Sequence, residues 1–238
     1  MECLMLNYLI RRWYNIGLVV ALGAICWGIF GDISKVQVIL LLNLVVLCWH
    51  QFEEMRWPGG SPWILNEVFN AQGGPADIYP LNQANCAFIN VVAWFAYLVP
   101  VFYPDLIWLG IAQILFGMGQ FVVHGIIINR KLKTFYNPGL AAVVLGHIPL
   151  GVWYLIEVYN TTTVRGWDWI FGILTLVAFI VICLRIIGYG LMVNRHSRFP
   201  FDSEEMSRWG RLTHLARAGI TPFMLSTDTH KNSSIKSK

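Results

Sequence analysis

Charge is scarce in this chain: only 13% of its 238 residues are charged, against about 25% in soluble domains. This shortage excludes an ordinary soluble domain, and 56% of the residues are hydrophobic. The uncharged stretches are long enough to cross a bilayer, which takes about 20 apolar residues each. We therefore predict an all-α, polytopic membrane helical bundle. Its six expected spans are Trp13–Phe30, Val36–Glu54, Gln83–Phe102, Leu106–Asn129, Leu140–Val158 and Asp168–Val193.

Three further features are missing. The five cysteines stand singly, with no Cys-x-x-Cys pair, so the sequence favours neither disulfides nor a cysteine zinc site. No small-residue cleavage site follows the first span, so we expect no signal peptide. No internal repeat is visible, which disfavours the repeat-built transporters. We predict one membrane domain over residues 1–193, with an insertion at 55–82, and a basic tail at 194–238 that is disordered toward its end.

Basic residues are concentrated in alternate loops, which predicts the orientation of the spans. Both termini and the loops after spans two and four should be cytoplasmic, and we expect a cell inner membrane. The net charge of +4 then reflects topology and attraction to anionic lipid head groups, and we expect no nucleic-acid partner. The residues that carry this signal are Arg11, Arg12, Arg56, Arg130, Lys131, Lys133 and the arginines of the tail.

Two segments outside the spans have helical patterns. Ser61-Pro62 resembles a helix start, with serine as N-cap, and Gly73-Gly74 would end that helix. With Trp63 on an apolar face, it is predicted to lie in the bilayer interface, either as a lid or as a simple anchor. A second, surface helix is predicted over Ser203–Ala218.

The most unusual polar residues close the second span, where His50, Glu53 and Glu54 follow an apolar run. Ionisable groups at membrane depth are costly, so each marks a candidate functional site. Positions three and four residues apart lie on one side of a helix, so we expect the three side chains to project together.

Other polar residues of the spans should converge on the same cytoplasm-facing cavity. His124 and His147 lie about 9–10 Å inside the boundary at the helical rise per residue. Arg185 is deep enough to need a carboxylate partner, for which the glutamate pair is the candidate. The residues expected to support the site are Asn43, Gln120 and Arg185, whereas Gln113 is read as a helix–helix contact and Glu157 as an interfacial residue.

The motifs resemble those of the HXXEE family of integral membrane proteins. His50-x-x-Glu53-Glu54, then His124, and then Tyr136-Asn137-Pro138-Gly139 match in order. The resemblance covers about residues 40–155. It implies the location of a site, to which Tyr136 adds a supporting residue, and it implies no particular reaction.

The first functional hypothesis is a membrane metalloenzyme that acts on an apolar or lipid-like substrate, hydrolytically or oxidatively. His50, Glu54 and His124 would bind a divalent metal, zinc or iron. Glu53 would act as general base or support a ligand, and His147 as an acid or fourth ligand.

Two alternatives stay open. The glutamate pair could share a proton and perform metal-free acid–base chemistry. Alternatively, the polar stripe could serve a proton-coupled transporter, although the polar groups stop halfway across the membrane.

Overall fold

The computed structural model describes residues 2–69 and 74–226, and in these ranges the chain is all-helical without strands. Six helical stretches of the described residues are long and apolar enough to cross a membrane, which confirms the predicted fold class. Five match the expected spans to within three residues, whereas the first begins at Leu6, seven residues before the expected Trp13. They are α1 (Glu2–Phe30), α2 (Lys35–Met55), α4 (Gln83–Phe102), α5–η2–α6 (Ile107–Phe121, Val122–Ile128, Asn129–Leu132), α7–η3–α8 (Leu140–Ala142, Val143–His147, Ile148–Thr161) and α9–η4 (Gly166–Phe179, Ile180–Leu191).

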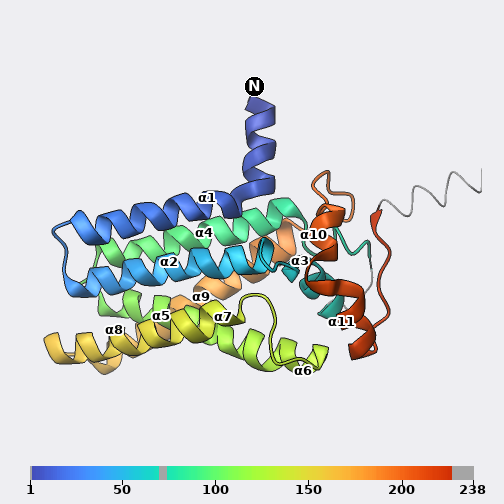
Figure 1. Ribbon diagram of the computed structural model, residues 1–238. Coiled ribbons are helices and arrows are strands. Elements are labelled where there is room, and N and C mark those ends of the chain that lie inside the picture. Colours follow the sequence, from blue (N-terminus) through green and yellow to red (C-terminus); the bar gives the residue numbers. More distant parts are fainter. Residues whose placement is uncertain (1, 70–73, 227–238) are drawn as a thin grey trace, which may run out of the picture.

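Helix α2 is the centre of the bundle, and α1, α4, α5 and α8 pack around it (Figure 1). It begins at Ser34, whose hydroxyl and backbone exchange hydrogen bonds with Gln37 in a capping box. Of its most apolar 18-residue window 61% is buried, against 6% for α9–η4. A polar group on α2 therefore has protein around it, whereas most side chains of α9–η4 are left for lipid.

Helix α1 is sharply bent at Arg12, whose backbone is non-helical. The stretch before the bend leaves the bundle at a steep angle (Figure 1). Arg11 and Arg12 both reach Asp202, at 3.0 and 3.6 Å. These two ion pairs connect the bend of α1 to Asp202 in the C-terminal segment.

Three of the spans change from α- to π-helix at the same end of the bundle. His124 lies in η2, His147 in η3 and Arg185 in η4. A π-helical turn shifts the side chains that follow it around the helix, and such turns occur often at functional sites. The end of the bundle that holds these segments and the end of α2 is called the site end below.

The insertion after α2 forms α3 (Ser61–Trp63) and the π-helical η1 (Ile64–Val68). The N-cap is Gly60, at φ +115°, so the prediction of Ser61 as N-cap is wrong by one residue. Trp63 is fully buried, and its indole donates to the carbonyl of Arg208 at 3.0 Å. Trp63, predicted on a bilayer-facing side, therefore packs inside the protein, whereas the position of the insertion at the bilayer interface stays a prediction, and Gly73 lies outside the described residues.

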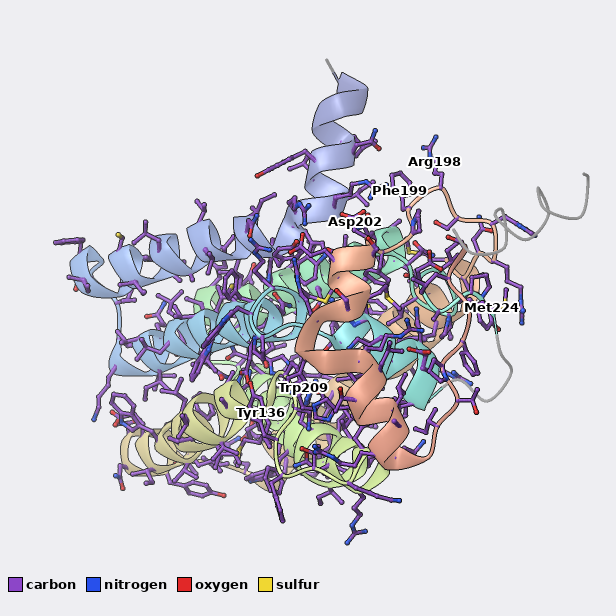
Figure 2. The ribbon with its side chains drawn as sticks, turned by 45° about the vertical axis from the view of Figure 1, so that its right-hand side comes forward. Tyr136, Arg198, Phe199, Asp202, Trp209 and Met224 are labelled. Atoms are coloured by element: carbon purple, nitrogen blue, oxygen red, sulfur yellow. The ribbon has the colours of Figure 1, made fainter. Side chains whose placement is uncertain are left out.

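The C-terminal segment (residues 199–226) lies across the site end and covers the insertion (Figures 1 and 2). The predicted helix over Ser203–Ala218 is broken at Trp209 (φ +51°), which separates α10 (Ser203–Ser207) and η5 (Arg208–Gly210) from α11 (Arg211–Ala218). Arg211 forms a two-pronged ion pair with the buried Glu67 of η1. The residues predicted to be disordered, 227–238, lie outside the described residues.

Candidate metal site

Three side chains from two spans meet at the site end. His50 and Glu54 come from the last turns of α2, and His124 comes from η2. One ligand atom from each lies within 4.8 Å of the others. Nε2 of His50 is 3.6 Å from Oε2 of Glu54, and Nε2 of His124 is 3.4 Å from its Oε1. The structure thus brings together the three residues that the sequence proposes as ligands.

The backbone sets the protonation of the His50 ring. Its Nδ1 lies 3.0 Å from the carbonyl oxygen of Gly139. A carbonyl only accepts, so Nδ1–H must be the donor. In the neutral ring, Nε2 is then an unprotonated nitrogen whose lone pair faces Glu54.

A chain of amides sets the His124 ring in the same way. Asn129 donates its amide to the carbonyls of Gly125 and Phe135, which leaves its oxygen to accept from Asn137 at 2.8 Å. The amide of Asn137 also donates to the His124 carbonyl, so its own oxygen accepts from Nδ1–H of His124 at 2.6 Å. This network assigns the unprotonated nitrogen of His124 to Nε2 as well.

The cluster therefore holds more acceptors than donors. Two imidazole lone pairs and two carboxylate oxygens face one another, and among the described residues Glu54 receives one neutral donor, the Ser61 hydroxyl at 3.2 Å. His50 and His124 are buried. Buried acceptors that face each other need a cation between them, either a proton or a metal ion. The arrangement is electrostatically incomplete without one.

The spacing fits a metal ion. Two ligand atoms that each lie about 2.1 Å from a tetrahedral ion are about 3.4 Å apart. The separations of 3.4 and 3.6 Å, which run to different oxygens of Glu54, are close to this value, and one ligand atom from each residue lies within 4.8 Å of the others. A charge-assisted hydrogen bond between the same atoms would be about 2.8 Å long. Two imidazoles and a carboxylate are ligands that suit zinc and non-haem iron.

Glu53, the predicted base, faces away from the cluster. Its carboxylate accepts from the Tyr136 hydroxyl at 2.7 Å and from the backbone N–H groups of Ala141 and Ala142 at 3.2 and 2.9 Å. These N–H groups belong to the first turn of the α7–η3–α8 helix, where carboxylates are stabilising. Burial and the bond to Glu53 raise the pKa of Tyr136, which keeps the phenol protonated as a donor. Glu53 thus anchors the loop that orients His50 and His124.

Gly139 of the same loop lies against both ligand rings. A Cβ atom there would be 2.6 Å from Cε1 of His124 and 2.8 Å from Cε1 of His50, and the residue has φ +102°. Only glycine allows both the backbone turn and the close approach. The Tyr-x-Pro-Gly motif therefore makes three separate hydrogen bonds. The Tyr136 hydroxyl donates to Glu53, the Asn137 oxygen accepts from His124, and the Gly139 carbonyl accepts from His50.

His147 is buried behind His50, with ring centroids 5.9 Å apart. Its Nδ1 is 2.6 Å from the oxygen of Asn43, so the predicted supporting residue Asn43 contacts His147. Nε2 of His147 has no hydrogen-bond partner among the described residues. The ring lies outside both the three-ligand group and the cavity lining.

The remaining predicted residues divide in two. Gln120 lines the same cavity as the cluster, and Gln113 joins helices by donating to the carbonyls of Leu40 and Tyr97, as expected. Arg185 is exposed and forms no ion pair with any described residue. The expected pairing of Arg185 with the glutamates is therefore absent.

A cavity of about 390 Å³ opens beside the cluster. Its polar lining consists of a few groups that surround the ligands, and most of the rest is aliphatic or aromatic. A largely apolar pocket with a few converging polar groups is the usual form of a small-molecule site. The polar lining residues are His50, Gln51, Glu54, Ser61, Asn90, Gln120 and His124.

The sequence reasoning missed two contributors. Ser61 was read as a helix cap, and its hydroxyl instead binds Glu54. Asn137 was quoted only as the variable position of the motif, yet it fixes the His124 tautomer. The signal available for Asn137 was its place in an Asn-Pro-Gly turn, where asparagine side chains commonly bind neighbouring backbone.

The fold and the cluster define a class: a polytopic helical membrane protein with a buried site of two imidazoles and one carboxylate. A family model described as "Protein of unknown function with HXXEE motif" matches residues 41–154, a little under half of the chain, and this match supports the resemblance of the chain to that family. The matched part includes the three ligands and the Tyr136–Gly139 loop. The comparison with curated proteins gave no match, and the comparison with solved structures gave none either.

Proposed function

We propose that the protein is a membrane-embedded, metal-dependent enzyme for an apolar or lipid-like substrate. The observation that carries this proposal is the surplus of acceptors around Glu54, at separations that fit a bound ion. His50, Glu54 and His124 would hold zinc or iron. Such an ion supplies Lewis-acid chemistry for hydrolysis or, if it is iron, supports oxidation.

The protein groups around the ligands have separate tasks in this proposal. The Gly139 carbonyl and Asn137 hold both imidazoles with Nε2 toward the cavity, which is the usual role of outer partners of metal ligands. Gln120 and Asn90 are the polar groups available to orient a substrate. The aliphatic walls would exclude water and take up an apolar chain. We place the site toward the cytoplasm because the basic loops adjoin this end.

Metal-free chemistry by the glutamate pair is less well supported. Such a pair must share a proton, and Glu53 and Glu54 bind different groups on different sides of α2. Transport is also less well supported, because the cluster and its cavity lie at one end of the bundle.

Elemental analysis of the purified full-length protein tests the proposal. We expect about one zinc or iron ion per chain in the wild type, and loss of that ion in His50→Ala and His124→Ala. His196→Ala, which removes an exposed histidine outside the site, is the matched control and should keep the ion. A wild-type protein that purifies folded, without stoichiometric metal, and does not bind added zinc or iron would contradict the proposal.

A further inference from the structure

A second cavity, of about 670 Å³, adjoins the cavity of the metal site. Five residues line both: Leu65 of η1, Val123 of η2, and Ile180, Leu184 and Tyr189 of η4. Because the two cavities share these residues, they are direct neighbours, and rotation of the shared side chains would connect them.

The second cavity reaches the lipid-facing side of the bundle. Its wall includes Ile180 and Phe69, which are 40% and 38% exposed. Segment η4 is held against α4, where Gly188 touches Ile89 and its carbonyl accepts from Asn85 at 3.3 Å. The cavity fills the space on the other side of η4, toward η2. A molecule in the bilayer could therefore enter between η2 and η4.

One charged residue lines this side cavity, and it is Arg185. Some arginines at the site end have carboxylate partners, as Arg11 has Asp202, Arg208 has Glu204 and Arg211 has Glu67, while others such as Arg198 form no ion pair with a described residue and line neither cavity. Arg185 forms no ion pair with a described residue. A guanidinium in a membrane span is costly unless it meets an anion or reaches the head-group layer. Its planar donors suit a carboxylate or a phosphate.

We propose that the side cavity admits a single-chain amphiphile with an anionic head group, which Arg185 binds while the chain extends past Leu184 toward the metal site. This inference rests on the proposed function only for what happens to the substrate afterwards. A single chain is favoured because the inner cavity, at about 390 Å³, is near the lower limit for ligand pockets. Carboxylate and phosphate heads share the chemistry that Arg185 recognises.

Binding of three labelled amphiphiles by the full chain in phosphatidylcholine nanodiscs tests the proposal: oleate, lysophosphatidate and neutral monoolein. We expect Arg185→Gln to weaken binding of at least one of the two anionic probes by about tenfold or more, which corresponds to one charge-assisted contact. Monoolein binding should not change. Arg198→Gln, an exposed arginine that lines neither cavity, is the matched control and should bind all three as the wild type does.

A second variant tests the route. Leu184→Trp places a large ring on the wall that both cavities share, so it should reduce binding of all three probes alike. Wild-type binding of both anionic probes that does not respond to Arg185→Gln would overturn the proposal. Equal competition by diacyl phosphatidylglycerol would also overturn it, because Arg185 would then be binding bulk lipid head groups.

Metal content separates this inference from the proposed function. Arg185→Gln and Leu184→Trp should retain the metal of the wild type, since neither residue touches a ligand. Metal-free protein with Arg185-dependent amphiphile binding would sustain the side cavity and refute the metalloenzyme. Metal-loaded protein that binds no anionic amphiphile would refute the side cavity alone.

Discussion

The two sides of the last turn of α2 carry the same functional group in opposite surroundings. On one side, the Glu53 carboxylate accepts from a phenol and two backbone amides. On the other, Glu54 faces two imidazole nitrogens that the network leaves unprotonated, with one hydroxyl as donor. Glu53 is electrostatically complete within the protein, and Glu54 is not. Of these two adjacent carboxylates, Glu53 is buried and Glu54 half-buried, and Glu54, which lacks donors among the described residues apart from Ser61, is the candidate for binding a cation.

The largest effects are expected when each carboxylate is replaced by an amide, because Glu53 and Glu54 should then affect different properties. Glu54→Gln removes one of the three proposed ligands. The metal affinity of the protein should therefore fall by more than about 100-fold, which is the upper end of the cost of losing a residue that only supports a ligand. Glu53→Gln should keep the metal and lower the thermal stability instead, because it weakens the anchor of the Tyr136–Gly139 loop. Equilibrium dialysis and thermal unfolding measure the two effects. Equal metal loss in both variants would contradict the division of roles.

Removing the partner of His124 should have the next largest effect. Asn137→Ala leaves all three ligands in place but frees the imidazole to rotate or change tautomer. Metal affinity should fall by about 10- to 100-fold, as for other outer partners of metal ligands. Asn90→Ala is the matched control, because Asn90 lines the same cavity and contacts neither histidine. An affinity unchanged in Asn137→Ala would show that the amide chain does not orient His124.

The structural role of Glu53 can be tested by removing one hydroxyl group that donates to it. Tyr136→Phe deletes one of three donors to a buried carboxylate, which should lower the free energy of unfolding by about 1.5 kcal/mol. Metal content should stay at the wild-type level. Chemical unfolding in detergent measures the first quantity, and elemental analysis the second. Metal loss without destabilisation would place Tyr136 in the binding site instead of its support.

The smallest expected effect concerns the C-terminal segment. Burial and the neighbouring Arg217 lower the pKa of His214, which stacks on Trp209 with ring centroids 3.8 Å apart. The undocked segment then binds a proton more readily than the docked one, so docking should weaken as pH falls below about 6.5. Arg208 lowers the pKa of Glu204 from its ordinary value of 4.5, so this carboxylate stays ionised at both pH 7.5 and pH 5.5. A change in docking between these two pH values is therefore expected from His214 and not from Glu204.

Hydrogen exchange or limited proteolysis of residues 199–226 measures this docking. His214→Phe keeps an aromatic ring on Trp209 and should remove the pH dependence between 7.5 and 5.5. A dependence that persists in this variant would assign it to another group.

The sequence predicted the spans and the meeting of His50, Glu54 and His124 because both follow from simple spacing, whereas their role as metal ligands stays a prediction. Apolar runs of about 20 residues mark spans, and the i, i+4 relation puts His50 and Glu54 on one side of α2. The same spacing placed Glu54 with His50 and set Glu53 apart, but it could not show what Glu53 binds, because its donors, the Tyr136 hydroxyl and the N–H groups of Ala141 and Ala142, come from a distant loop. The prediction that Arg185 pairs with a glutamate was wrong for a similar reason. Its depth in the sixth span suggested a carboxylate partner, but the packing of η4 on α4 leaves the side chain in the lining of the second cavity.

Local chemistry also misled at two turns. Serine before proline is a common helix start, but Gly60 takes the cap because the chain needs a positive φ there. The Ser203–Ala218 pattern is helical throughout, yet Trp209 leaves the helix and stacks on His214, and both rings lie against Trp63. In Figure 2 the same ring lies beside Tyr136, at a centroid distance of 6.2 Å. The second departure brings together residues far apart in sequence, Trp209 with Trp63 and with Tyr136.

The joint between Arg12, Tyr14 and Gln83 on the first and third spans and Glu205 in the C-terminal segment bears on the order of assembly. Chains fold from the N-terminus as they are synthesised. Glu205 leaves the ribosome after all six spans, so this joint can close only when the bundle already exists. The insertion that touches Glu54 through Ser61 is therefore covered last. Until that moment the cluster of His50, Glu54 and His124 can form without this cover, so the proposed ion would have an interval in which to bind newly made protein.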